Sequence, residues 1–188
     1  MAKKTSLIKV EKWGRIINYK TKRIHLRPFT KDDANLIYQL DGDSDVMKYI
    51  TLGIPRTFDE VNDIYLPKIL KSYSRDNAFG IFAAYLNNSD EYIGWFQFEI
   101  DNEFENSIEI GWRLKKQYWG SGYATEVAKM LSNVGVDEGK TIVARAMLEN
   151  KASVRVMEKA GLTFVKEFWG DYEPHSGSHD VLYKRHAL

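Results

Sequence analysis

The order of secondary structure in this 188-residue chain predicts a single mixed α/β sheet. Residues 108–114 alternate between apolar and polar side chains, which is typical of a strand with two different faces. From residue 124 the apolar side chains follow the i, i+3, i+4 spacing of an amphipathic helix. Residues 141–147 then form a nearly continuous apolar run, as expected of a strand covered on both faces. Antiparallel hairpins come before the central strand and a strand–helix–strand crossover follows it.

The first half of the chain is expected to hold three strands and three helical segments. Thr30 is the expected N-cap of a helix that reaches about Leu40. Thr57 and Glu60 have the spacing of a capping box, so a longer helix begins there, and Pro67 is expected to kink it. The expected strands are residues 21–28, 78–86 and 92–100, and residues 43–50 form a short helical turn.

The second half is expected to end with one more helix and two strands. Asn150 can cap that helix, and Gly161 can end it. The strands are residues 163–169 and 181–185, on either side of a loop over residues 170–180. No internal repeat or linker interrupts this order, so residues 21–188 are expected to form one domain.

Composition excludes several kinds of protein. The chain has no cysteine, which rules out thiol nucleophiles, disulfides and thiolate metal sites. Apolar residues make up 44% of the chain and charged residues 28%, as in globular proteins. No apolar run approaches the roughly 20 residues that span a bilayer, and the first six residues lack the apolar block of a signal peptide. We therefore expect a cytoplasmic protein without a membrane partner.

Charge is unevenly distributed although the net charge is only +1. Residues 1–31 hold ten Lys or Arg against one acid, and residues 1–20 are interpreted as a basic N-terminal extension. This arm is either simply solvated or contacts an anionic surface such as ribosomal RNA. Residues 87–109 hold seven acids and no base, which either attract a cationic substrate or keep an exposed hairpin soluble.

A glycine-containing loop, residues 117–122, joins the central strand to the following helix. Such a junction brings free backbone N–H groups and the positive end of the helix dipole together, which favours phosphate. The loop lacks the third glycine of a dinucleotide fingerprint and the Gly-Lys-Ser/Thr end of a P-loop. Its Gln117, Gly120 and Gly122 resemble instead the Gln/Arg-x-x-Gly-x-Gly/Ala loop of the GNAT N-acetyltransferases.

The resemblance extends over nearly the whole chain and is closest to the GNAT branch of the ribosomal-protein N-terminal acetyltransferases, the RimJ/RimL type. Leu162 is a departure, since phenylalanine is usual there. The resemblance implies the GNAT fold, a mainly antiparallel sheet with helices on both faces and a splayed parallel strand pair. The matching segments are residues 21–27, 33–34, 43–49, 109–112, 119–126 and 149–164.

The same resemblance implies acetyl-CoA as cosubstrate and no metal. The backbone of the loop would hold the pyrophosphate, and the central strand and Asn150 would bind the pantetheine arm. The implied cosubstrate-binding residues are Trp112, Arg113, Leu114, Gln117, Trp119, Gly120, Ser121, Gly122, Tyr123, Ala124 and Asn150. The spacing of His175 and His179 would suit a metal only on a helix, and a loop is expected there.

Two residues are candidates for moving protons. An amine must lose a proton before it attacks a thioester, and Glu109, on the polar face of the central strand, is the candidate base. The alternative for Glu109 is a structural hydrogen bond or a pairing with arginine. Many GNAT enzymes protonate the leaving thiolate with a tyrosine of the last helix, but no tyrosine occurs between Tyr123 and Tyr172. Ser153 is the candidate that remains, and its alternative is packing beside Asn150.

The resemblance thus predicts acetyl transfer from acetyl-CoA to a primary amine, by direct attack in a ternary complex. The acceptor is either a protein N-terminal α-amino group or a small amine. Two other functions stay open, a non-catalytic acyl-CoA sensor and a ribosome-associated binding protein acting through the basic arm. A homodimer would be compatible with an exposed sheet edge.

Overall fold

A seven-stranded sheet in the order β3-β4-β5-β6-β7-β9-β8 forms the centre of the protein. The computed structural model describes residues 8–11, 14–17, 19–73, 78–170 and 178–187. Neighbouring strands are antiparallel except β6 and β7, which are parallel, so the predicted mixed sheet is confirmed. The strands are β3 (Ile24–Pro28), β4 (Gly80–Leu86), β5 (Tyr92–Ile100), β6 (Ser107–Leu114), β7 (Thr141–Met147), β8 (Thr163–Gly170) and β9 (Ser178–Arg185).

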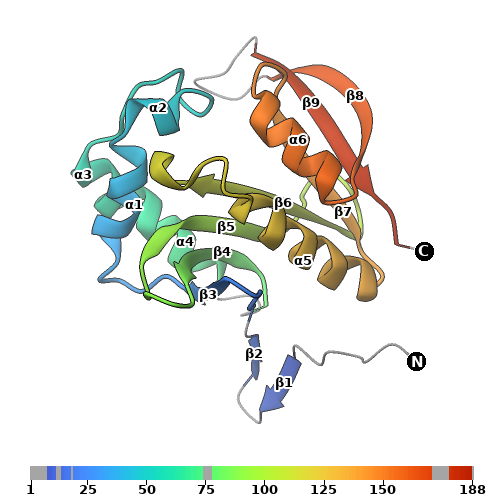
Figure 1. Ribbon diagram of the computed structural model, residues 1–188, viewed down its shortest axis with the longest axis horizontal. Coiled ribbons are helices and arrows are strands. Elements are labelled where there is room, and N and C mark those ends of the chain that lie inside the picture. Colours follow the sequence, from blue (N-terminus) through green and yellow to red (C-terminus); the bar gives the residue numbers. More distant parts are fainter. Residues whose placement is uncertain (1–7, 12–13, 18, 74–77, 171–177, 188) are drawn as a thin grey trace.

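Helices cover both faces of this sheet. Figure 1 shows α1 to α4 gathered at one end of the sheet, with α5 crossing in front of β6 and α6 beside it. Buried side chains of β6 such as Ile108 and Ile110 pack with Val127 and Leu131 of α5 in one core cluster. A second cluster joins α1 and α4 to the opposite face. The helices are α1 (Ala34–Asp41), α2 (Ser44–Met47), α3 (Phe58–Glu60), α4 (Leu66–Ser72), α5 (Tyr123–Asp137) and α6 (Lys151–Lys159).

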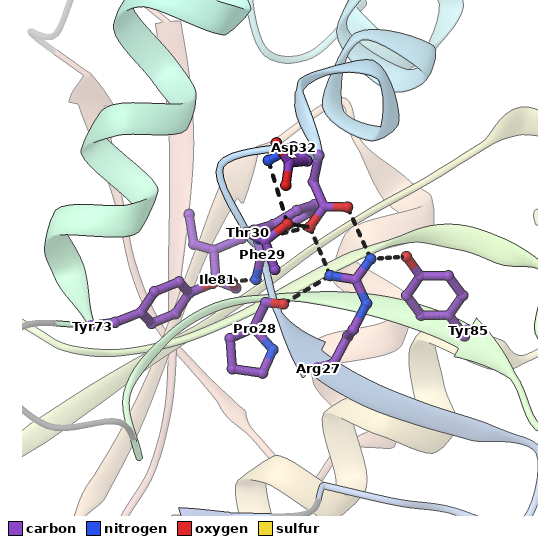
Figure 2. A network of polar contacts seen from close by, with 9 residues as sticks. Arg27, Pro28, Phe29, Thr30, Asp32, Tyr73, Ile81 and Tyr85 are labelled. Carbon is purple, nitrogen blue, oxygen red and sulfur yellow. Dashed lines mark hydrogen bonds and ion pairs between the residues drawn. The ribbon is translucent and has the colours of Figure 1, made fainter.

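The first helix starts later than expected. Its N-cap is Asp33 rather than Thr30, so that prediction was wrong. The carboxylate of Asp33 accepts hydrogen bonds from the Thr30 N–H at 2.6 Å and from two Arg27 nitrogens at 2.7 and 2.9 Å, which holds residues 30–32 in a turn. Figure 2 shows the Arg27 side chain directed toward this turn and toward Tyr85. Burial opposes ionisation of Asp33, but these bonds outweigh it and lower its pKa. Arg27 also donates to the Tyr85 hydroxyl, which ties the turn to β4.

Pro67 lies directly after a widened turn of the helix, at the start of α4. The capping box is confirmed, since the Glu60 N–H donates to Thr57 Oγ1 at 3.2 Å and the Thr57 N–H donates to Glu60 Oε2 at 2.7 Å. A π-helical turn, η1 (Val61–Tyr65), then widens the helix, and Pro67 follows in the first turn of α4. A widened turn frees the backbone from the i→i−4 pattern that a proline cannot continue.

The two ends of the chain add smaller elements. Strands β1 (Ile8–Glu11) and β2 (Gly14–Ile17) form a separate two-stranded sheet that projects from the main one (Figure 1). Tyr19 is buried in the core, one residue before the predicted end of the basic extension at residue 20. That boundary stays a prediction. The last strand starts at Ser178 instead of 181, and residues 171–177 of the expected loop lie outside the described residues. Among the helices that the structure describes, none is long and apolar enough to cross a membrane.

Candidate active site

The parallel pair β6–β7 is short and opens into a gap. Pairing covers three rungs and ends where Glu109 lies opposite Val143. Beyond that rung β6 continues to Leu114 paired only with β5, while β7 continues to Met147 paired with β9. The β6 edge that faces the gap therefore offers backbone N–H and C=O groups that no strand of the described chain takes up. An extended ligand with amide groups could pair there as an additional strand would.

The loop after β6 exposes a second set of backbone donors. A 3₁₀ turn, η2 (Lys116–Tyr118), leads to Gly120 and Gly122, whose φ values of +73° and +78° lie in the left-handed region that glycine adopts without strain. Gly122 is the N-cap of α5, and no side chain caps the helix. The N–H groups of its first turn are thus available, together with the positive end of the helix dipole, to an anion.

A cavity of about 350 Å³ lies between these two sets of donors. That volume is within the range of small-molecule sites. Nine of the eleven residues predicted to bind the cosubstrate line it, and so does Ser153, whereas Gln117 and Ser121 do not. The remaining lining residues are Asp45, Val46, Tyr49, Ile50, Tyr118, Thr125, Ala152, Arg155, Val156 and Lys159.

Several of the side chains predicted to bind the cosubstrate already have a hydrogen-bond or ion-pair partner within the protein. The Gln117 amide donates to the Tyr118 hydroxyl at 3.1 Å. The Arg113 guanidinium is ion-paired with Asp41 of α1, so Arg113 can offer a ligand only its backbone. The Trp119 indole N–H donates to the Leu114 carbonyl at 2.8 Å, which closes the loop on the end of β6.

The position of Asn150 is compatible with both of its predicted tasks. Its Oδ1 accepts a hydrogen bond from the Ser153 N–H at 3.2 Å, which confirms it as the N-cap of α6. The amide of Asn150 lines the cavity, and its Nδ2 has no hydrogen bond to another described residue. The same side chain can therefore cap the helix with its oxygen and donate to a ligand with its nitrogen.

Two cations at the cavity were not foreseen. Arg155 and Lys159 are four residues apart on α6, both line the cavity, and neither forms an ion pair with another described residue. Two other cations nearby are ion-paired, Arg113 with Asp41 and Lys116 with Asp45. The sequence contained a signal for their position. Residues 152, 155, 156 and 159 have the i, i+3, i+4, i+7 spacing that places side chains on one side of a helix. The pair adds positive charge beside the loop.

Glu109 is not among the described residues that line the cavity, because β6 presents it on the opposite face. Its carboxylate accepts hydrogen bonds from Arg145 at 3.0 Å and Gln97 at 3.2 Å, and the side chain is 28% exposed. Burial raises the pKa of Glu109, although Arg145 opposes the shift. Glu99 lies directly opposite on β5, and burial raises its pKa as well. The alternative of an arginine pairing is thus realised, and Glu109 still retains solvent access.

The acidic stretch is only partly available to a cationic ligand. Arg145 of β7 pairs with Asp101 at 2.7 Å and Glu103 at 2.8 Å in addition to Glu109. One guanidinium thus faces three carboxylates, which leaves an excess of negative charge at this side of the sheet. Among the described residues, no group of three or more His, Cys, Asp or Glu is arranged to hold a metal ion. His175 lies outside them, and His179 pairs with Glu167 at 2.7 Å.

The arrangement suits a long ligand that carries both amides and phosphates. The free edge of β6 and the Asn150 amide can bind an amide chain, and the α5 N-terminus with Arg155 and Lys159 can bind phosphates. Glu109 can accept a proton on the other side of β6, at the rung where β6 and β7 part. The first two sets of groups suit the amide-containing arm and the phosphates of an acyl-CoA, and Glu109 suits a base that deprotonates the acceptor.

Known proteins share this sequence pattern and fold. The family model of the acetyltransferase (GNAT) domain matches residues 23–163. The N-acetyltransferase YnaD of Bacillus subtilis is 33% identical over 164 residues, which cover 81% of this chain and 92% of that protein. The FsC-acetyl coenzyme A-N(2)-transacetylase of Aspergillus fumigatus is 28% identical over 162 residues, which cover 81% of this chain and 68% of that protein.

A solved structure of a GNAT-family acetyltransferase from Bacillus anthracis superimposes with a TM-score of 0.76 and 28% identity, covering 91% of this chain and 99% of that one. The family model, the sequence relatives and the solved structure agree on the family and on the fold. The chain therefore belongs to the GNAT acetyltransferase family, and it is an N-acetyltransferase that takes its acetyl group from acetyl-CoA.

Proposed function

We propose that the enzyme transfers the acetyl group directly to a primary amine in a ternary complex, with the cosubstrate on one side of β6 and the acceptor on the other. The observation that carries the proposal is the rung at Glu109 and Val143, where the parallel pair ends. A thioester lying in the gap beyond this rung would be within reach of both faces of the sheet. The N–C bond would form as the C–S bond breaks.

The residues at the cavity would hold the cosubstrate. The backbone of Trp112, Arg113 and Leu114 would pair with the pantetheine amides, and Asn150 Nδ2 would donate to the same arm. The N–H groups of residues 120–124 would bind the pyrophosphate. The side chains of Arg155 and Lys159 would meet the remaining phosphate, on the 3′ position of the ribose.

Two side chains would move protons. Glu109 would take the proton from the acceptor ammonium, and its raised pKa brings it closer to neutrality than an ordinary carboxylate. Ser153 lines the cavity, and its hydroxyl has no hydrogen bond to another described residue, so it could pass a proton to the departing thiolate. The last helix of the described chain offers no tyrosine for this step.

The acceptor is an amine that carries positive charge before it reacts. The excess of carboxylates around Arg145 supports this class, since it would attract an ammonium group toward Glu109. The resemblance to the RimJ/RimL branch supports a protein N-terminus as acceptor, and a small amine is the alternative. Ribosome association through residues 1–20 and a homodimer remain predictions. A non-catalytic acyl-CoA sensor would bind the cosubstrate but show no turnover with any amine.

Thermal unfolding with and without acetyl-CoA tests the first half of the proposal. A ligand at about 100 times its dissociation constant stabilises the native state by about 2.7 kcal/mol, which raises the unfolding temperature visibly. A thiol-release assay over small amines and N-terminal peptides then tests transfer. Folded protein whose unfolding temperature does not change at millimolar acetyl-CoA would rule out this cavity as the cosubstrate site.

A further inference from the structure

Arg23 lies outside the cavity but contacts the loop that forms it. It directly precedes β3, and its guanidinium reaches across to the start of α5. Nη1 donates to the Ser121 carbonyl at 3.0 Å, and Nε donates to Glu126 Oε2 at 2.6 Å. The backbone N–H of Arg23 also donates to Glu126 Oε1 at 3.0 Å, so main chain and side chain hold the same carboxylate.

Further contacts fix the guanidinium in this position. Its central carbon lies 4.4 Å from the centre of the Tyr123 ring, a cation–π distance. The Arg23 carbonyl accepts a hydrogen bond from the Asn87 N–H at 2.9 Å, which ties its backbone to the turn after β4. The first strands of the sheet thus reach the glycine loop, about a hundred residues further along the chain, through one side chain.

The bond to Ser121 determines where a neighbouring N–H points. In a trans peptide the C=O and the N–H of the same unit point in opposite directions. Because the Ser121 carbonyl points to Arg23, the N–H of Gly122 points away from it. Gly122 lines the cavity and has a φ of +78°, so this peptide unit could rotate if nothing held its carbonyl.

The bond to Glu126 removes an electrostatic conflict. Glu126 is in the first turn of α5, where a carboxylate would compete with a phosphate for the helix N-terminus. Partial burial opposes its ionisation, but hydrogen bonds from Thr21 and Arg23 outweigh burial and lower its pKa. Glu126 is therefore ionised at neutral pH, and Arg23 pairs with its carboxylate outside the cavity lining.

We propose that Arg23 and Glu126 form a clamp that presents the Gly122 N–H to the pyrophosphate of acetyl-CoA, so that Arg23 is a positioning residue for cosubstrate binding. The clamp rests on the placement of the cosubstrate in the proposed function. Because both side chains are partly accessible to solvent, 42% for Arg23 and 22% for Glu126, the ion pair should contribute little to folding. Its effect should appear in affinity.

The test is a double-mutant cycle on the full-length protein, with the dissociation constant of acetyl-CoA measured by calorimetry. We expect Arg23→Ala and Glu126→Gln each to weaken binding about tenfold, the size of one charge-assisted hydrogen bond, and the double variant to lose no more than either. Arg23→Lys, which keeps the charge but not the two-pronged geometry, should lie between wild type and Arg23→Ala. The unfolding temperature of the ligand-free variants should stay close to that of the wild type.

Lys22→Ala is the matched control, because it removes an exposed positive charge one residue away. It should leave affinity unchanged. Loss of affinity in Arg23→Ala but not in Glu126→Gln would mean that Arg23 contacts phosphate itself, and it would overturn the clamp. Unchanged affinity in both single variants, or additive losses, would overturn it too. Wild-type protein that binds no acetyl-CoA would instead contradict the proposed function.

Discussion

The polar face of β6 carries two charge networks that differ in burial and balance. Toward its end, Arg113 and Arg56 both pair with Asp41, whose side chain is only 2% exposed. Nearer its start, Glu109 shares Arg145 with two other acids and is 28% exposed. Strand alternation places Glu109 and Arg113 on the same face, yet one network is closed to solvent and the other is open to it. A closed network fixes architecture, while an open carboxylate with a raised pKa can exchange protons.

The largest change in stability should come from breaking the closed network. Asp41→Asn keeps the shape but leaves the buried Arg113 guanidinium without its counterion. We expect the free energy of unfolding to fall by about 3–5 kcal/mol, measured by urea denaturation. A loss below 1 kcal/mol would show that the two networks do not differ in the way proposed.

A smaller loss should follow from opening the second network further. Arg145→Met removes the cation shared by Asp101, Glu103 and Glu109, and the free energy of unfolding should fall by about 1–3 kcal/mol. Arg145 stabilises the ionised form of Glu109, so its removal should raise the pKa of Glu109 further. Because the base must be ionised, the acid limb of the pH–rate profile should move to higher pH. An acid limb that stays at the same pH would show that the ionisation of Glu109 does not control the rate.

The cavity side of β6 offers a prediction on specificity. Arg155→Ala combined with Lys159→Ala should weaken acetyl-CoA binding about tenfold but leave binding of the acetylated dephospho-CoA, which lacks the 3′-phosphate, nearly unchanged. Calorimetry with both ligands measures the ratio. Lys151→Ala, on the same helix but outside the cavity lining, is the control. Equal weakening of both ligands would contradict a contact with the 3′-phosphate.

The smallest effect should come from an ion pair on the surface. Asp45 pairs with Lys116 at 2.5 Å, but the side chains are 55% and 59% exposed. Asp45→Asn should cost less than about 1 kcal/mol in urea denaturation, and that cost should shrink in high salt. A loss as large as that of Asp41→Asn would show that burial does not separate the two kinds of pair.

Periodicity and glycine spacing were sufficient to predict the sheet, the loop and the N-cap at Asn150. They failed at Thr30 for a local reason, because the Asp33 carboxylate accepts the Thr30 N–H and is held by Arg27, so the helix begins only after Asp33. The sequence could not identify Asp41 as the partner of Arg113, or Arg145 as the arginine that pairs with Glu109, because each pair joins elements that are far apart in sequence. Alternation indicates on which face of a strand a side chain lies, but not which charged residue of another element pairs with it.

The account rests most directly on a division of labour between the two faces of β6, and Glu109→Gln tests it in one protein. Burial raises the pKa of Glu109 in the folded protein, so the free energy of unfolding of the wild type falls as pH rises through that pKa. The variant has no carboxylate to ionise at this position, and it should therefore be at least as stable as the wild type at neutral pH. We predict an unchanged dissociation constant for acetyl-CoA and turnover, on the best amine from the screen, lower by about 100- to 10,000-fold. Unchanged turnover, or affinity lost together with turnover, would contradict the account.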